Sequence, residues 1–230
     1  MELKILTSNS TRTVLDALIP AYEKNTGNKV SISADSAKAM VARIKVGETG
    51  DVVILSSGAV KELAADGAVI PASHRPFARA MVGVGVAKGT AHPDISTVDA
   101  LRKSLLAAQS IAHTVHGASG MYIPALLEKL GIAEQMRSKT VTRPGGYIGR
   151  VVVAGEAEIA LQQIPELLAV DGLELVGPVP DAVQKVFETA TGLVSASKNT
   201  VAAQAMLDYF ATPAHAGLFA SKGLQQAAQP

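Results

Sequence analysis

Short apolar runs alternate with amphipathic stretches along the first part of the chain. Apolar runs at 3–6, 29–33 and 52–55 have the length of buried strands, and the stretches 11–24 and 38–46 between them repeat apolar residues at helical spacing. Strands that alternate with helices in this way are typical of a parallel sheet with helices on its faces. The pattern therefore predicts an α/β fold.

The stretch 11–24 has the clearest helical pattern. Ser10 or Thr11 offers a hydroxyl that can cap its first turn, and Gly27 follows its end. Its apolar side chains recur three and four residues apart, which places them on one face of a helix. We expect that face to pack against the sheet, with the stripe made of Val14, Leu15, Leu18, Ile19 and Tyr22.

A second α/β block is expected after the apolar run 80–87. Gly83 and Gly85 in this run allow a close backbone approach, and we interpret the run as a crossover into a second lobe. A strand at 188–196 would return the chain, and a helix at 200–210 would follow. Between the crossovers we expect helices at 98–107, 121–130 and 147–154 and strands at 110–115, 139–142 and 158–161.

These elements predict a two-lobed α/β protein. Lobe 1 would hold residues 1–80 and 191–230, and lobe 2 would hold residues 81–190, with a ligand cleft between them. We expect two mixed sheets, each flanked by helices and joined by two crossover strands, so that the lobes can close by a hinge.

Composition removes several classes of function. The 230 residues include 21 Lys+Arg and 20 Asp+Glu, so the net charge of +1 gives no field to recruit nucleic acid or an anionic membrane. The absence of cysteine excludes disulfides, thiol catalysis and zinc–thiolate sites. The five histidines show no metal-ligand spacing, and no glycine-rich nucleotide motif occurs. We therefore expect no metal and no cofactor.

The first residues enter a strand-like run directly, without a signal-peptide pattern. We expect a periplasmic protein if a signal peptide has been removed, and a cytoplasmic protein otherwise. No apolar run approaches the roughly 20 residues of a membrane span, so we expect no membrane insertion.

Polar tracts occur where four expected helices begin, at 7–11, 33–38, 117–120 and 143–147. Hydroxyls and free N–H groups at a helix start suit a bound oxyanion. Each tract on its own is also explained as an ordinary helix cap. The repeated design favours one shared site at the carboxyl ends of the strands, as expected for open α/β sheets.

Four segments carry a resemblance to a known family. They are 21–30 (AYEKNTGNKV), 46–52 (VGETGDV), 119–122 with 130–131 (SGMY, LG) and 155–159 (GEAEI). In this order and spacing the chain resembles the type II solute-binding proteins, typified by the molybdate-binding component of ABC transporters. The resemblance spans nearly the whole chain and implies two lobes that close over a small anion, with an ABC permease as partner.

The resemblance also implies ligand positions. Ser10 matches a serine of the family's first loop, while Ser119 and Gly145 match backbone N–H ligands. Two positions differ from the family's ligand residues, because Ala37 replaces a serine and Gln163 replaces a tyrosine. With Lys38 and Arg143 nearby, these differences favour a di- or tricarboxylate over molybdate. The predicted ligand-binding residues are Ser8, Asn9, Ser10, Ser36, Ala37, Lys38, Ser57, Ser119, Arg143, Gly145, Gly146, Tyr147 and Gln163.

The sequence leaves alternatives for the function. A solute-binding protein would bind and release its anion without covalent chemistry. An isomerase on the same fold, acting on a tricarboxylate such as aconitate, would need a proton-transfer group, for which we consider Lys38, His116 and Tyr147, and also His113 and Glu48. An effector-sensing domain of a transcription regulator would need an added helix-turn-helix, for which the chain has no room. Asp51 we interpret as a loop-fixing acceptor.

Overall fold

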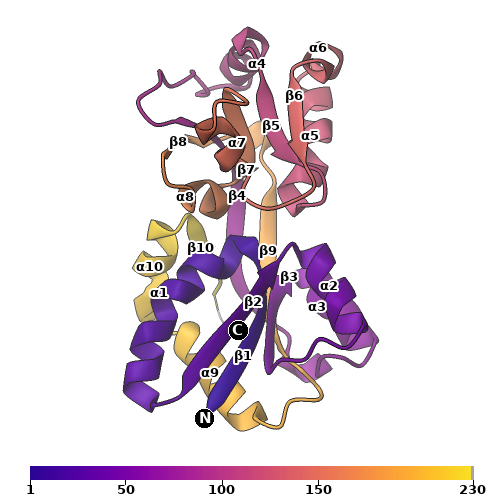
Figure 1. Cartoon of the computed structure of the whole chain (residues 1–230), viewed down its shortest axis with the longest axis vertical. Coiled ribbons are helices and arrows are strands. Elements are labelled where there is room, and N and C mark those ends of the chain that lie inside the picture. Colours follow the sequence, from indigo (N-terminus) through magenta and orange to yellow (C-terminus); the bar gives the residue numbers. More distant parts are fainter. Residues whose placement is uncertain (229–230) are drawn as a thin grey trace. The chain divides into compact units, whose positions relative to one another are not determined.

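A parallel ladder of three strands forms the centre of unit 1 in the computed structural model, which describes residues 1–228 (Figure 1). Unit 1 comprises Met1–Arg79 and the segment from Phe187 to the C-terminus, and unit 2 comprises Ala80–Val186. The chain passes from unit 1 to unit 2 within β4 (Arg75–Ala87) and returns within β9 (Val186–Leu193).

In unit 1, β1 (Glu2–Ser8) pairs in parallel with β2 (Lys29–Asp35) and with β3 (Val52–Ser56). Ser8 lies beside Asp35 and Thr7 beside Ile54, so the carboxyl ends of all three strands meet at one edge. β9 follows β3 in antiparallel orientation, and the first residues of β4 pair with β10 (Leu224–Gln226).

Helices cover both faces of this sheet, as the right-handed connection of parallel strands requires (Figure 1). On one side, Leu6, Val53 and Leu55 pack against α2 (Ala37–Lys45) and α3 (Ser57–Ala65). The other side carries α1 (Asn9–Thr26), α9 (Thr200–Phe210) and α10 (Ala216–Ser221), preceded by the 3-10 turn η3 (Pro213–His215).

Helix α1 confirms the expected apolar stripe but not the expected cap. All five stripe residues are buried. The N-cap is Ser8, and Ser10 and Thr11 lie inside the first turn. Both expected capping hydroxyls are engaged elsewhere. Thr11 Oγ1 bonds to Thr7 Oγ1 at 2.6 Å and to the Ser8 carbonyl at 3.0 Å, and Ser10 Oγ contacts Ser8 Oγ.

In unit 2, the strands follow the order β4, β7 (Ile159–Gln163), β5 (Ile111–Thr114) and β6 (Thr140–Arg143). β5 is parallel to β6 and β7, while β4 is antiparallel to β7 and to β8 (Leu173–Pro178).

The helices of unit 2 are α4 (Val98–Ala107), α5 (Ala118–Lys129), α6 (Ala133–Arg137), α7 (Gly149–Val153) and α8 (Ile164–Leu168). Two 3-10 turns complete the chain, η1 (Pro71–Ser73) in unit 1 and η2 (Asp181–Val183) in unit 2.

The glycines of β4 serve close packing, as expected. A Cβ on Gly83 would lie 2.7 Å from Ile164 Cγ1, and a Cβ on Gly85 would lie 2.9 Å from Leu173 Cδ2. α8 and β8 can therefore approach the strand only where it lacks side chains.

Most expected elements differ from the observed ones at their ends, β4, β9 and α7 among them. β4 begins at Arg75 because Phe77 and Ala78 are already buried within unit 1. β9 runs from Val186 to Leu193 instead of 188–196. The helix expected at 147–154 is only Gly149–Val153, because the Gln162 side chain bonds to the carbonyl of Gly146 and the N–H of Ile148 and holds these residues as a loop.

Asp51 is the loop-fixing acceptor that the sequence indicates. The residue is 8% exposed, and its carboxylate accepts bonds from the Lys4 N–H at 2.8 Å, the Ser197 hydroxyl at 2.6 Å and the Asn199 amide at 3.2 Å. It thereby ties the start of β3 to β1 and to the segment that begins α9.

We expect Asp51→Ala to lower the free energy of unfolding by roughly 2–4 kcal/mol, because three donors lose a buried charged acceptor. Urea denaturation followed by circular dichroism measures the change. Asp16→Ala is the control, since its ion pair with Arg12 is exposed, with 50% of the Asp16 side chain accessible. Equal effects of the two substitutions would contradict the role assigned to Asp51.

Candidate functional site

The first predicted loop of unit 1 lies where β1 meets α1. Ser8 is the N-cap of this 18-residue helix, but its side chain makes no capping bond and instead contacts Ser10 Oγ at 3.1 Å. The first-turn N–H groups of α1 therefore lack a side-chain acceptor, and the positive end of the helix dipole lies at the sheet edge. Asn9, the first helical residue, is half-buried there.

The second loop follows β2 and shows an ordinary helix cap. Ser36 Oγ accepts the Ala39 N–H at 3.2 Å, as the simpler interpretation of this tract expects. Ala37 is the first residue of α2. Lys38 is exposed and forms no ion pair within the described part of the chain, so its charge is available at this edge.

The third loop joins β3 to α3. Ser56 caps α3 by accepting the Ala59 N–H at 3.3 Å. The neighbouring Ser57 hydroxyl takes no part in capping and bonds to Nε2 of His74 at 3.1 Å. Sequence reasoning missed this histidine, because the two residues lie 17 positions apart and no motif links them.

In unit 2, two buried hydroxyls without a partner lie on either side of the turn between β5 and α5. Thr114 Oγ1 and Ser119 Oγ belong to residues that are each 1% exposed, and neither atom has a hydrogen-bond partner among the described residues. The N-cap of α5 is Gly117, which offers no side chain. An unsatisfied buried polar group costs about 1–3 kcal/mol, which a bound acceptor would relieve.

Gly120 lets α5 begin this close to β5. A Cβ at this position would lie 1.8 Å from the Thr114 carbonyl oxygen and 2.6 Å from Thr114 Oγ1. Only glycine fits, although its backbone angle is not in the left-handed region.

The loop after β6 carries four predicted residues. Gly145 and Gly146 are exposed, and the Tyr147 ring lies 5.5 Å from the Arg150 guanidinium. Arg143 forms an ion pair with Glu156, and its side chain is 42% exposed. A carboxylate 13 residues further along the chain therefore pairs with this cation, which sequence reasoning missed.

Gln163 ends β7 and lies next to an acid that the sequence did not single out. Its side-chain amide donates to Glu166 at 3.4 Å. Burial raises the pKa of Glu166 to about 8 and outweighs the bonds donated by the Gln163 backbone and side chain, which lower it. Glu166, 7% exposed, is thus a neutral carboxylic acid near pH 7.

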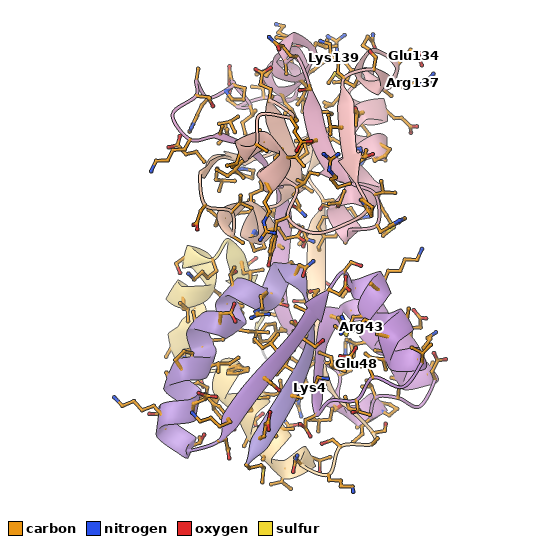
Figure 2. The ribbon with its side chains drawn as sticks, viewed as in Figure 1. Lys4, Arg43, Glu48, Glu134, Arg137 and Lys139 are labelled. Carbon is orange, nitrogen blue, oxygen red and sulfur yellow. The ribbon has the colours of Figure 1, made fainter. Side chains whose placement is uncertain are left out.

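Two of the considered proton-transfer groups are engaged in structure. His113 is buried, and its Nδ1 bonds to the Thr114 carbonyl at 2.8 Å. Burial opposes the charge on Glu48, but bonds from Ser33, Arg43 and Lys4 hold its pKa below the ordinary value, and Figure 2 labels Glu48 beside Arg43 and Lys4. His116, by contrast, is exposed.

Strand pairing gathers the predicted residues into two sets. In unit 1, the register of β1, β2 and β3 brings the loops at Ser8, Ser36 and Ser57 to one edge. In unit 2, Thr114 lies beside Arg143, and β7 runs parallel to β5, so the loops that carry Ser119, Gly145 and Gln163 share an edge. Each set presents hydroxyls and N–H groups, which is the chemistry of an anion site.

The family of the chain follows from its sequence match. The sequence model of the family described as bacterial extracellular solute-binding protein matches residues 3–225. The chain belongs to this family. This solute-binding protein is also 34% identical over 235 residues to a protein named aconitate isomerase from a Pseudomonas species, and the match covers 99% of the chain and 89% of that protein.

Solved structures confirm the fold of this solute-binding protein. The periplasmic molybdate-binding protein of Azotobacter vinelandii superposes with a TM-score of 0.84 at 17% identity, covering 98% of this chain and all of that one. A sulfate-binding protein of Mycobacterium tuberculosis gives a TM-score of 0.78 at 18% identity, covering 99% and 87%. The expected type II binding-protein fold is therefore correct.

Within residues 1–228, no helix is long and apolar enough to cross a membrane. No group of three or more potential metal ligands gathers among the same residues.

We expect Gly120→Ala to lower the free energy of unfolding by about 2 kcal/mol or more, because the new methyl group overlaps the Thr114 carbonyl and must push α5 off the sheet. Thermal and urea denaturation measure the loss. Gly58→Ala is the matched control, since a Cβ on Gly58 meets nothing within 4 Å. A Gly120→Ala protein as stable as the control would show that α5 does not begin against β5.

Glu166 should make stability depend on pH. Because its pKa is raised in the folded protein, its contribution is complete below about pH 4.5 and is lost as the pH rises toward about 8. Glu166→Gln keeps the side chain neutral, so we expect this variant to gain stability relative to the native protein by a few kcal/mol between these limits. Urea denaturation at several pH values measures both proteins. Parallel pH curves would contradict a neutral Glu166.

Proposed function

We propose that this solute-binding protein binds a small di- or tricarboxylate through loops at the carboxyl ends of its parallel strands. The observation that carries the proposal is the pair of buried, unpartnered hydroxyls, Thr114 Oγ1 and Ser119 Oγ, at the N-terminus of α5. Together with the uncapped N-terminus of α1 beside Ser10, they offer donors without acceptors at the carboxyl ends of two parallel ladders.

Local charge supports a carboxylate ligand. The chain has a net charge of only +1, so selectivity for an anion depends on these few donors and on Lys38. Arg143 remains a candidate contact, because its ion pair with Glu156 is partly exposed and such pairs contribute only about 0–1 kcal/mol. A ligand carboxylate can therefore replace Glu156 at little cost.

Two sequence differences from the resembled family and one relative favour a ligand larger than a single oxyanion. Ala37 and Gln163 stand where the resemblance implies a serine and a tyrosine ligand of a small oxyanion. The relative at 34% identity is named for an enzyme that acts on aconitate, a tricarboxylate. Both observations favour separated carboxylates over a single tetrahedral oxyanion.

The family description supports the cellular setting that we propose. Extracellular solute-binding proteins deliver their ligands to a permease, so we propose a periplasmic location and an ABC permease as partner. Release would follow opening of a hinge at the two passages of the chain within β4 and β9.

A second candidate function is favoured by one specific observation. The match to the aconitate isomerase covers 99% of the chain, with no unit missing. The same clamp would then hold a tricarboxylate while a proton moves between two carbons of an allylic system. Binding is common to both candidates, and turnover separates them.

Isothermal titration with citrate, cis-aconitate, trans-aconitate, succinate, molybdate and sulfate tests the proposal. We expect a polycarboxylate to bind and Ser119→Ala to weaken its affinity by about 10- to 100-fold, because a hydrogen bond to a charged group is lost. Ser138→Ala, an exposed serine of the same unit, is the control and should bind like the native protein.

Each result has a defined meaning. Binding of molybdate or sulfate in preference to every carboxylate would contradict the proposed ligand class. NMR spectra of the bound carboxylate after incubation separate the two functions, because an isomerase changes its ligand and a transport protein returns it unchanged.

A further inference from the structure

A cavity in unit 1 is lined by a histidine and a serine that contact each other. Its volume is 370 Å³, and its walls include Ser57, His74, Arg79, Glu188 and Gln226. Ligand pockets usually measure about 300–1,000 Å³, so a small carboxylate fits this volume. The cavity lies beside the end of β3, because Ser56 pairs with Thr189 and both Ser57 and Thr189 line it.

The Ser57 hydroxyl fixes the imidazole of His74. The distance from Oγ to Nε2 is 3.1 Å, and Ser56 rather than Ser57 caps the helix. His74 Nδ1 has no hydrogen-bond partner among the described residues. When Nε2–H donates to Ser57, the lone pair of the ring lies on Nδ1, which can then accept a proton.

Other acid–base groups near the loops are less suited to this task. The His113 ring is buried and bonded to a carbonyl, and Glu166 is buried against Gln163. Lys38 and His116 are exposed, so water screens their charge and competes with a ligand for their hydrogen bonds. His74 combines partial burial, a fixed ring and a cavity large enough for the ligand.

We propose that His74 is the proton-transfer group of an allylic isomerisation of a small unsaturated tricarboxylate, and that Ser57 is its positioning residue. This inference rests on the second candidate function. Ser57 belongs to the predicted ligand loops and lines the cavity, so the cavity includes one residue of the proposed binding loops of unit 1.

The proposed step conserves atoms and charge. The His74 imidazole accepts a proton from the methylene carbon next to the double bond, and the electron pair of the broken C–H bond forms the new double bond. The electrons of the old double bond take a proton from the imidazolium at the other end of the allylic system. No oxidant, metal or further reactant is needed.

Charged groups around His74 fit an anionic intermediate. Arg79 and Glu188 also line the cavity and form an ion pair at 3.0 Å, in which the side chains are 51% and 58% exposed. Such an exposed pair is weak, so Arg79 can turn to a ligand carboxylate and stabilise the negative charge that develops when the proton leaves.

Proton exchange in D₂O tests the role of His74 separately from binding. Native protein is incubated with cis-aconitate, and NMR follows deuterium incorporation at the methylene carbon together with formation of the trans isomer. His74→Gln keeps an amide that can bond to Ser57 but accepts no proton, so we expect at least a 100-fold slower exchange with unchanged affinity by titration. His92→Gln, an exposed histidine paired with Glu174, is the matched control and should exchange at the native rate.

Two further measurements do not depend on the folding of one variant. The native exchange rate should fall at acidic pH, because a protonated imidazole cannot accept a proton from the ligand. Ser57→Ala should slow exchange, and Ser57→Thr, which restores a hydroxyl, should recover most of it.

The outcomes distinguish this inference from the binding proposal. Aconitate that binds to the native protein but never exchanges, or that exchanges equally fast with His74→Gln, would overturn the role of His74 and leave binding intact. A native protein that binds no polycarboxylate would overturn both.

Discussion

Parallel pairing in register is the constraint on which both units depend. Because β1, β2 and β3 run in the same direction with matched ends, their following loops meet at one edge, and β5, β6 and β7 repeat the arrangement. Each strand then feeds a helix, so several helix N-termini gather at the same edge. Donors without acceptors therefore concentrate where the backbone itself supplies a positive potential.

Close packing sets how these donors are presented. Gly120 allows α5 to begin against the Thr114 carbonyl, and this contact buries the hydroxyls of Thr114 and Ser119 without partners. Gln162 fixes the loop at Gly146 and Ile148 in a similar way, by bonding to its backbone. These buried donors without partners lower the stability of the free protein, and a ligand that accepts their hydrogen bonds would restore it.

The two proposed functions share one binding requirement and differ in proton transfer. An anion clamp needs only donors and a hinge, whereas an isomerase needs a group that takes up and returns a proton near neutral pH. Ser57 and His74 illustrate how small that difference is. One hydroxyl, freed because its neighbour Ser56 caps the helix, fixes an imidazole at a cavity wall.

The sequence by itself determined the α/β alternation, the buried stripe of α1 and the role of Asp51, because periodicity and local turn chemistry depend on neighbouring residues. It also located the polar loops, since helix starts carry local signals. Only the tertiary structure decided that Ser8 rather than Ser10 occupies the N-cap position of α1, that Glu156 pairs with Arg143, and that His74 meets Ser57. These outcomes depend on which side chains packing brings together, and neither spacing nor composition records such distances.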